Sequence, residues 1–599
     1  MMMNTIKCRL DLLDTYVPTK SFTPFAMDQD FDRIASSWFA QFSLSLRQQD
    51  VPGCVSLFHS SGWLRDLLVF TWNLRTLNGH DQILNYLTSN MKLTTISQLK
   101  LSSDDLYFKP SPGDLPGSIS SGFTFSTPIG IGRGLFTLTP TDPVSGIWKA
   151  FTLLMSLHSL NDYEPIGAEQ GNYHGNAMCW SEVREQRARV IEANPHVLIV
   201  GAGQNGLQVA ARFKQMGIPT LLIEKNKRIG DQWRKRYPSL TLHTTKEHHT
   251  MLYQPYPETW PRYTPRDKVA DWLEQYAVSQ DLVVWMQSQP LPTPSYDEQK
   301  KEWSVCIDRN GQILTIHPKH IVLATGTLGG AYTPSVEGHS IFNGYTLHSD
   351  SYTGGPQFYG KRVVVISLAL DIHVRGAKSV TLLQRSSTCV QSSKTVVEML
   401  DRVWAPDIPT EVADYRAAGT PFNLIKQTLR EHKDEYWEKD KELLEGLIKA
   451  GLNVDLGPDG SGILPLVSER GGGYWMDVGC ADYVISGKIK VKSTSGIRKF
   501  TETGLMLEDG TVLEADVVVF ATGFVNIRTV MKEIFGDAID KAGPVGGVDE
   551  EGEVKGAYRS TGHPGLWYAP GDFQLSRFGS RFLAIQLQAI ELGYMKQGI

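Results

Sequence analysis

Residues 196–206 read HVLIVGAGQNG, and this stretch decides the fold of the larger part of the chain. Its first five residues form the apolar run of a buried strand, and three glycines follow with the spacing Gly-x-Gly-x-x-Gly. A helical pattern, LQVAARFKQMG, and a second strand pattern, PTLLIEK, complete the unit. A glycine-rich turn between a strand and a helix can cradle the phosphates of a dinucleotide. The sequence therefore predicts a βαβ unit that holds such a cofactor.

Each glycine of this turn has its own task. Gly201 permits the tight turn, Gly203 lets the pyrophosphate approach the backbone, and Gly206 lets helix and strand pack closely. The amino terminus of the helix presents free N–H groups to the phosphates. Glu224 ends the second strand, near the spacing that holds a ribose hydroxyl. The residues predicted to bind the cofactor here are Gly201, Gly203, Gln204, Asn205, Gly206, Glu224 and Lys225.

The composition is that of a globular protein without a nucleic-acid partner. Hydrophobic residues make up 41% of the 599 positions and charged residues 21%, and the net charge of −5 comes with no dense basic block. The six cysteines stand singly, so no zinc or thiol motif and no metal site is predicted. No signal-like segment and no apolar run of membrane length is visible, which makes the cytoplasm the expected location. An oligomer is compatible with the sequence.

Changes of texture along the chain predict several domains. Strands alternate with helices after residue 195, which indicates an α/β fold. Resemblance to a known family, carried by motifs after residue 195, implies two Rossmann-like dinucleotide-binding domains, an FAD domain with an NADPH domain inserted in it, preceded by an α+β cone-like domain. The predicted parts are an irregular arm at 1–28, the α+β domain at 29–164, a linker at 165–194, the FAD domain at 195–355 and 501–599, and the NADPH-like domain at 356–500.

The α+β domain begins with helically spaced apolar residues at Phe31–Leu46 and ends in strand-like segments such as WKAFTLLMSLHSL. Its segment GWLRDLLVFTWNLRTLNGHDQI resembles the nuclear-transport-factor-type fold, in which a long helix packs into a curved sheet. Such folds often hold an apolar ligand, which makes Trp63, Trp72 and Arg75 candidates for lining a pocket. Ordinary core packing is the favoured explanation for both tryptophans.

Features outside the βαβ unit favour FAD at the first site. Two apolar strands end in the same tripeptide, Ala-Thr-Gly, at 324–326 and at 521–523. Near the carboxyl terminus, Gly571-Asp572 precedes a helical pattern at Phe578–Leu592, whose amino terminus could stabilise negative charge on a reduced flavin ring. These segments add Ala324, Thr325, Gly326, Thr522, Gly523, Gly571 and Asp572 to the predicted cofactor site.

From residue 196 onward the sequence resembles the flavin-containing monooxygenase family, close to its plant auxin-forming members and their fungal relatives. The linker fingerprint of that family, F-x-G-x-x-x-H-S-x-x-Y, is present as Phe342, Gly344, His348, Ser349 and Tyr352. The resemblance implies that His348 lies between the two nucleotide domains and couples them. We predict His348 and Tyr352 as catalytic residues.

Two segments after the ribose acid, GDQW at 230–233 and SLTLHT at 239–244, resemble flavin-contacting loops of the family. An asparagine that some members place near the flavin has no clear counterpart, and His248 and His249 occupy the region instead. The two loops add Gln232, Trp233, His243 and Thr244 to the predicted cofactor site.

The second glycine-rich unit of the family, for NADPH, is expected at 361–385, which reads KRVVVISLALDIHVRGAKSVTLLQR. Both strand patterns are present, and Gln384–Thr388 resembles the site for the 2′-phosphate, where Arg385 would bind. The glycine turn is missing, because Ser367 and Leu368 follow the first strand directly. Since Cβ atoms in the turn would crowd the pyrophosphate, NADPH binding is predicted to be weakened or lost.

Three explanations of the missing turn stay open. A faulty gene model or an internal deletion in a normal NADPH enzyme is the one we favour. The second is a working flavoprotein that binds NADPH weakly through Arg385 and His348. The third is a pseudoenzyme, or an oxidase-like protein that its own substrate reduces.

The resemblance implies that NADPH reduces FAD, that O2 reacts with the reduced flavin, and that one oxygen atom enters a small organic substrate. Hydroxylation, N- or S-oxygenation and oxidative decarboxylation of an indole-pyruvate-like acid are all compatible, in a setting such as secondary metabolism. A Baeyer–Villiger monooxygenase is the closest alternative, although its fingerprint usually ends in Trp where Tyr352 stands. An NADPH-impaired flavoprotein that acts as a binding protein is another.

Overall fold

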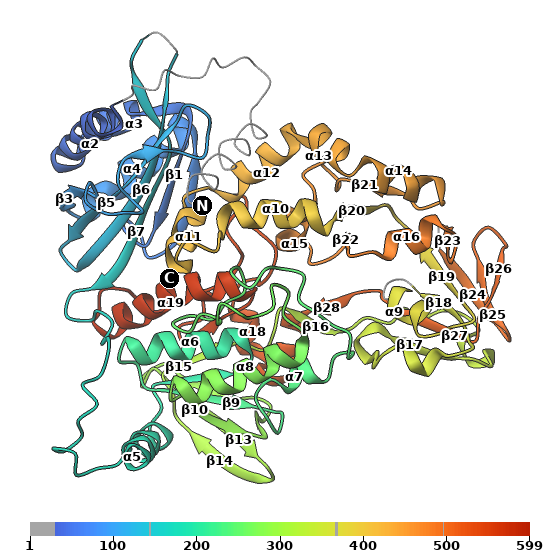
Figure 1. The fold of residues 1–599 in the computed structure, drawn as a ribbon. Helices are drawn as coiled ribbons and strands as arrows, with labels where there is room; N and C mark the ends of the chain where they lie inside the picture. Colours follow the sequence, from blue (N-terminus) through green and yellow to red (C-terminus); the bar gives the residue numbers. More distant parts are fainter. Residues whose placement is uncertain (1–29, 143–144, 366–368, 495, 599) are drawn as a thin grey trace. The chain divides into compact units, whose positions relative to one another are not determined.

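The computed structural model of the protein describes residues 30–142, 145–365, 369–494 and 496–598. The predicted arm at 1–28 lies outside the described residues. The chain forms two compact units, one of residues up to Asn161 with Ala418–Pro421, the other of Asp162–Ala417 with residues from Phe422 onward (Figure 1). No described helix is both long and apolar enough to cross a membrane.

The first unit is a mixed sheet with helices packed on it, drawn in blue in Figure 1. Its strand order is β2-β1-β7-β6-β5-β3, with β4 paired to β5, and only β1 and β7 run parallel. Its elements are α2 (Phe31–Gln48), α3 (Val51–Ser56), β1 (Phe58–Leu67), β2 (Leu74–Asn78), α4 (Gly79–Asn90), β3 (Ser97–Leu101), β4 (Ser111–Pro112), β5 (Ile119–Thr127), β6 (Gly130–Pro140) and β7 (Trp148–Leu160).

The helix predicted from Phe31 is present as α2, and its apolar face forms the centre of this core. The Asp30 side chain caps its first turn by accepting from the backbone N–H of Arg33. Trp38 stacks on Phe42, with ring centroids 5.1 Å apart, and also contacts Phe136 of β6. Burial of these large aromatic rings stabilises the unit.

The three residues named as candidate pocket residues lie in and beside β1 and β2. Trp63 is buried in β1, as ordinary core packing predicts, and Trp72 is half-buried between the two strands. The guanidinium of Arg75 lies over the ring of Tyr86, 5.2 Å from its centroid. Arg75 is therefore engaged with a ring of its own unit.

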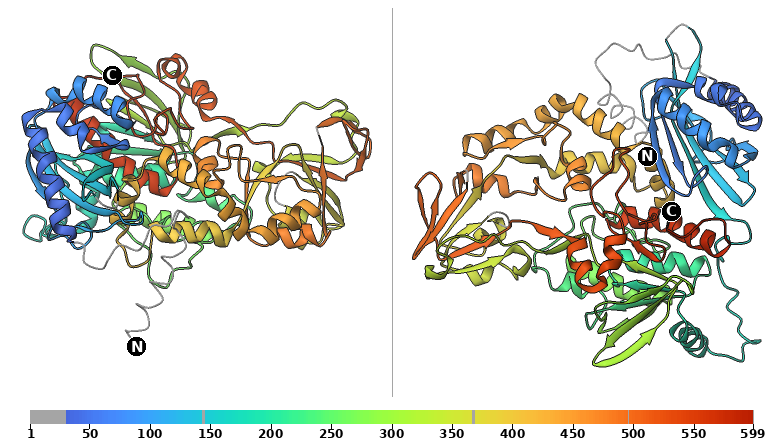
Figure 2. Two further views of the ribbon diagram at one scale, coloured as in Figure 1. Left: turned by 90° about the horizontal axis from the view of Figure 1, so that it is seen from above. Right: turned by 180° about the vertical axis from the view of Figure 1, so that it is seen from behind.

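The second unit contains two five-stranded parallel sheets. The first has the order β10-β9-β8-β15-β29, built from β8 (Val197–Val200), β9 (Thr220–Glu224), β10 (Val283–Met286), β15 (His320–Leu323) and β29 (Leu566–Tyr568). Its helices are α6 (Gln204–Gln215), α8 (Arg266–Ser279) and α19 (Phe573–Glu591). The red helix α19 packs beside α6, and the green hairpin of β13 (Glu302–Arg309) and β14 (Gln312–Ile316) projects from the sheet (Figures 1 and 2).

The second parallel sheet has the order β17-β27-β18-β19-β23. Its strands are β17 (Tyr345–His348), β18 (Arg362–Val365), β19 (Ser379–Gln384), β23 (Ile489–Ser493) and β27 (Val517–Phe520). The strand pairing differs from the predicted limits at 355 and 501: β17 pairs with β27, and β27 pairs with β18, so both β17 and β27 belong to this second sheet. Both segments had been assigned to the FAD domain. An apolar run fits either buried parallel sheet equally well, so only strand pairing separates them.

Antiparallel β16 (Leu328–Ala331) and β28 (Phe524–Asn526) pair with each other where the chain passes between the two parallel sheets. The predicted linker at 165–194 contains the helix α5 (Trp180–Ala193). Other elements that bear on the site are α7 (Asp231–Arg234), α9 (Ala369–Val374), β20 (Thr388–Ser392), α10 (Ser393–Val403), α11 (Thr410–Ala418), α12 (Phe422–Glu431), α13 (Lys433–Lys439), α14 (Lys441–Lys449), α15 (Ile463–Glu469), β22 (Tyr474–Asp477), α16 (Cys480–Ile485) and α17 (Ile527–Phe535).

Candidate functional site

The turn between β8 and α6 is shaped as a phosphate-binding turn requires. Gly201 has a φ of +106°, a conformation that side chains rarely adopt, and an added Cβ would stand 2.6 Å from the Ala324 carbonyl oxygen. A Cβ on Gly206 would overlap the Gly201 carbonyl oxygen at 2.0 Å. At Gly203, the residue before α6, a Cβ would approach only the Gln232 amide nitrogen, at 3.4 Å. The face above Gly203 is therefore open to a ligand.

The buried carboxylate of Glu224 closes this turn from the end of β9. One oxygen accepts from the backbone N–H of Ala202 at 3.0 Å, and the other accepts from the backbone and side-chain N–H groups of Asn226. The ammonium of Lys235 donates to Asn226, whereas the predicted Lys225 side chain is exposed. Glu224 thus holds its own backbone, and its remaining lone pairs are those that a ribose hydroxyl would use.

Two residues of the GDQW loop have polar atoms that the described chain leaves unpaired. Both amide atoms of Gln232 and the indole nitrogen of Trp233 are buried without a hydrogen-bond partner. Buried polar atoms are almost always paired in native proteins, so such a cluster beside the open face of Gly203 indicates a polar ligand. The residues present therefore fit the pyrophosphate and flavin portions of FAD.

The first turn of α6 is connected to the carboxyl-terminal loop that was predicted to meet the flavin. The Asn205 amide donates to the carbonyl oxygens of Ala569 and Gly571, at 3.1 and 2.9 Å, while Gln204 is half-buried beside it. Asp572 caps α19 by accepting from the N–H of Leu575. This helix begins at Phe573, five residues before the predicted start, so its amino terminus directly follows Gly571-Asp572.

The two Ala-Thr-Gly segments follow strands of different sheets. Ala324 is buried after β15, and the exposed Thr325 and Gly326 continue beyond the sheet edge. Thr522 and Gly523 follow β27 of the second sheet, and the Thr522 hydroxyl donates to the carbonyl oxygen of Tyr332, the residue after β16. The two segments therefore lie at the carboxyl ends of two sheets, where α/β proteins bind their ligands.

His243 and Thr244 lie in the loop after α7. His243 is exposed, whereas Thr244 is half-buried and its hydroxyl bonds to Nδ1 of His249 at 3.2 Å. The second ring nitrogen of His249 bonds to the Thr264 hydroxyl at 2.8 Å. His249 has both ring nitrogens engaged within the protein and holds this loop in place.

The two predicted catalytic residues are placed differently. His348 ends β17, is buried, and packs its ring against Phe524 of the linker strand β28, with centroids 5.3 Å apart. Its Nε2 is buried without a partner in the described chain. Tyr352 instead lies in the core of the second sheet, stacked on Phe358, and its hydroxyl donates to Asp371 at 2.5 Å. This position supports a structural role for Tyr352 in place of the predicted catalytic one.

The second nucleotide unit, β18–α9–β19, contains a carboxylate in its first helical turn. The predicted turn residues Ser367 and Leu368 lie outside the described residues. Asp371 accepts from the Tyr352 hydroxyl, from the backbone N–H of Gly355 at 2.9 Å and from the Ser239 hydroxyl at 2.9 Å. Arg385, the predicted phosphate ligand, is exposed after β19.

Sequence reasoning missed a buried ion pair beside the flavin end of the site. Arg577 of α19 and Asp414 of α11 form two parallel hydrogen bonds of 2.9 and 2.8 Å, and both side chains are almost fully buried. Arg577 also donates to the carbonyl oxygens of His248 and Thr250, each at 2.7 Å. No local sequence pattern indicates this ion pair, because the two residues are 163 positions apart and each resembles a surface charge.

At the opposite edge of the first sheet, His196, His320 and Glu591 have the spacing of a metal site among the described residues. Each imidazole Nε2 lies 3.5 Å from a Glu591 oxygen. The indole N–H of Trp567, however, donates to Nδ1 of His320 at 3.2 Å. The proton of His320 then resides on Nε2, so the lone pair that a metal needs is absent. The group is a set of polar contacts between Glu591 of α19 and two histidines at the edge of the sheet.

Lowering the pH from 6.5 toward 4 is expected to destabilise the protein through this cluster. Burial, with a smaller contribution from His320, lowers the pKa of His196 to about 4, while the unfolded chain protonates near pH 6.5. The unfolded state therefore binds more protons in this window, and the contribution of neutral His196 is lost as the pH falls. In urea unfolding, His196→Gln should flatten the slope by up to about 1.4 kcal/mol per pH unit. The exposed His317→Gln control should keep the wild-type slope, and an unchanged slope in the His196 variant would contradict the prediction.

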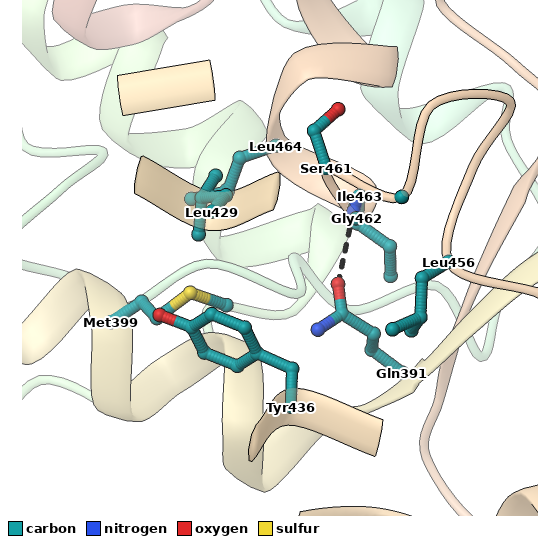
Figure 3. A pocket seen from close by; sticks show the side chains of 10 residues that line it. Gln391, Met399, Leu429, Tyr436, Leu456, Ser461, Gly462, Ile463 and Leu464 are labelled. Atoms are coloured by element: carbon teal, nitrogen blue, oxygen red, sulfur yellow. Dashed lines mark hydrogen bonds between the residues drawn. The ribbon is translucent and has the colours of Figure 1, made fainter. Parts of the chain in front are cut away.

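A small cavity lies away from these residues, between α10, α12, α13 and α15 (Figure 3). The Gln391 side chain accepts from the backbone N–H of Ile463 at 2.9 Å, and leucine, methionine and tyrosine side chains line the rest. A volume of about 10 Å³ accommodates a single water molecule. The cavity is a packing feature and cannot admit a substrate.

Two five-stranded parallel sheets joined by paired linker strands, with a glycine-rich turn after the first strand of one of them, place the second unit in the α/β class. The model of the flavin-binding monooxygenase-like family matches residues 194–535. The chain belongs to that family. It is a flavin-dependent monooxygenase, and FAD and NADP are the cofactors that membership supports.

Among curated relatives, the probable indole-3-pyruvate monooxygenase YUCCA7 of Arabidopsis thaliana is 30% identical over 351 residues, covering 56% of this chain and 76% of the relative. The indole-3-pyruvate monooxygenase YUCCA1 of Oryza sativa subsp. japonica is 26% identical, covering 58% and 81%. Among solved structures, a flavin-containing monooxygenase from Stenotrophomonas maltophilia has a TM-score of 0.43 at 19% identity, covering 66% of this chain and 98% of that one. An oxidised steroid monooxygenase bound to NADP has a TM-score of 0.49 at 18% identity, covering 66% and 86%.

Proposed function

We propose that this monooxygenase inserts one oxygen atom into a small organic substrate, with an indole-pyruvate-like keto acid as the first candidate. The open turn at Gly203 beside the unpaired, buried amide of Gln232 carries the assignment of FAD to the first parallel sheet. The names of the plant relatives, which act on indole-3-pyruvate, support the substrate class. A purified protein that is yellow and converts indole-3-pyruvate with consumption of O2 would support both parts. A purified chain that takes up no FAD would contradict the assignment of FAD to the first parallel sheet.

The second parallel sheet, in this proposal, binds NADPH weakly. The carboxylate of Asp371 lies in the first turn of α9, where the family's pyrophosphate would approach, and its negative charge opposes a phosphate. Arg385 is left as the charged group for the 2′-phosphate, and His348 lies at the linker between the sheets. These residues favour a working flavoprotein with low nicotinamide affinity.

An anaerobic titration of the FAD-loaded protein with NADPH tests this proposal. Inserting a Gly-x-Gly turn after Ile366 should tighten NADPH binding at least ~10-fold, because the turn supplies backbone N–H groups to the pyrophosphate. Arg385→Ala should weaken binding of NADPH about 10-fold and leave that of NADH, which lacks the 2′-phosphate, unchanged. Equal NADPH affinities before and after the insertion would contradict the proposal that the missing glycine turn weakens NADPH binding.

The first unit is proposed to have the nuclear-transport-factor-type fold and to bind a small apolar molecule. The long helix α2 packed on a mixed sheet supports the fold. The family model matches residues 194–535, which lie almost entirely in the second unit. Activity of the second unit therefore does not depend on this assignment.

A further inference from the structure

A buried histidine beside α19 keeps one ring nitrogen unpaired. His248 is 8% exposed, and its Nδ1 is buried without a hydrogen-bond partner among the described residues. Its Nε2 lies 3.6 Å from a carboxylate oxygen of Asp572. The ring of Trp404 stands perpendicular to the imidazole, with centroids 4.7 Å apart. The ring is thus held with one nitrogen toward a carboxylate and the other without an assigned partner.

This histidine adjoins the predicted flavin end of the cofactor site. Asp572 is the residue that caps the amino terminus of α19. The carbonyl oxygen of the preceding residue, Gly571, accepts from the Asn205 amide in the first turn of the phosphate-binding helix α6. Gly571, which contacts the glycine-rich turn unit, therefore directly precedes Asp572, whose carboxylate faces His248.

Buried hydrogen bonds and one ion pair fix the position of the loop that contains His248. Arg577 donates to the His248 carbonyl oxygen at 2.7 Å and pairs with the buried Asp414. The indole N–H of Trp404 donates to the same Asp414 carboxylate at 2.8 Å. Two helices, α10 and α11, are thereby anchored around one imidazole, which is the support that a precisely oriented acid–base group needs.

We propose that His248 and Asp572 form an acid–base pair that takes a proton from a group bound at the flavin end of the site and later returns it. The inference rests on the proposed function, because that group is bound at the FAD site. Asp572 favours the tautomer with the proton on Nε2, which leaves a lone pair on Nδ1. Nδ1 accepts the proton of a bound N–H or O–H group, and the carboxylate stabilises the resulting imidazolium until the proton is returned. Hydrogen bonds of this kind are often long before a ligand binds.

Burial keeps the His248 ring neutral, and nearby charges act on its pKa in both directions. Burial is the main cause that lowers the pKa of His248, and Arg577 and His243 lower it further. The carboxylates of Asp572 and Asp414 act in the opposite direction and raise it. Because these carboxylates oppose the effect of burial, an imidazolium formed by proton transfer has nearby anions to stabilise it.

The test is a pH titration of the visible absorption of the FAD-loaded protein between about pH 3 and 8, a range that extends below the usual histidine pKa because burial lowers the pKa of His248. The wild type should show a one-proton transition, and His248→Asn should remove it. Asp572→Asn keeps a good helix cap but loses the charge, so the transition should move to lower pH by about one unit. His317→Asn, at an exposed histidine, should titrate as the wild type does.

Each outcome decides between the two claims. A wild-type protein without a transition, or an FAD-loaded His248→Asn protein that titrates as before, overturns the acid–base pair while the proposed function stands. An unchanged midpoint in Asp572→Asn overturns the role of the carboxylate within the pair. A chain that remains colourless with FAD refutes the proposed function itself. FAD binding and far-ultraviolet circular dichroism of each variant show whether it has folded.

Discussion

The Gly206→Ala protein is expected to lose FAD. Its new Cβ would overlap the carbonyl oxygen of Gly201 at 2.0 Å and lie 3.3 Å from the side chain of Ala324, both of which are held by the parallel sheet. The helix α6 must therefore move, and its amino-terminal N–H groups move away from the phosphates that they would bind. We expect FAD affinity to fall at least ~100-fold, which corresponds to about 2.7 kcal/mol.

The measurement is the flavin absorbance retained per protein after dialysis, followed by titration with FAD. Gly472→Ala is the matched control, because a Cβ there meets nothing within 4 Å and the residue has no positive φ. It should retain wild-type flavin content. Stoichiometric FAD in Gly206→Ala, with wild-type affinity, would show that the phosphates are not held at this turn.

Asp414→Ala is expected to cause the largest loss of stability among single changes near the site. Its carboxylate makes two hydrogen bonds with Arg577 and accepts a third from Trp404, all in the interior. Removing it leaves a buried guanidinium without its counter-charge, which costs about 3–5 kcal/mol. The loss should appear as a lower urea midpoint and should be accompanied by weaker FAD binding, since Arg577 also holds the His248 loop.

Glu411→Ala provides the control on the same helix. Glu411 pairs with Arg581 at 2.7 Å, but its carboxylate is 70% exposed, so its removal should cost less than about 1 kcal/mol. Equal losses of unfolding free energy in Asp414→Ala and Glu411→Ala would contradict the claim that burial makes the Asp414–Arg577 pair the more important one. Replacing Asp414 and Arg577 together by Leu and Met should restore part of the stability, because the unpaired buried charge is then absent.

The sequence alone determined the first nucleotide unit. The apolar run at 197–200, the three glycines and the helix after them are local features, since sterics at Gly201 and Gly206 leave few alternatives to a tight turn. The helix α2 followed in the same way from apolar spacing. The linker fingerprint predicted that His348 lies between the two nucleotide domains, but it did not show that His348 ends β17 or that Tyr352 is buried against Asp371.

Tertiary structure alone decided which sheet each buried strand joins and which charges meet in the interior. The strands at 345–348 and 517–520 have the apolar character of any parallel strand, so only pairing assigns them to the second sheet. His248 meets Asp572, and Asp414 meets Arg577, across hundreds of positions in the chain. A single sequence records no such pairing, because a charge destined for the interior looks like a surface charge until its partner is placed beside it.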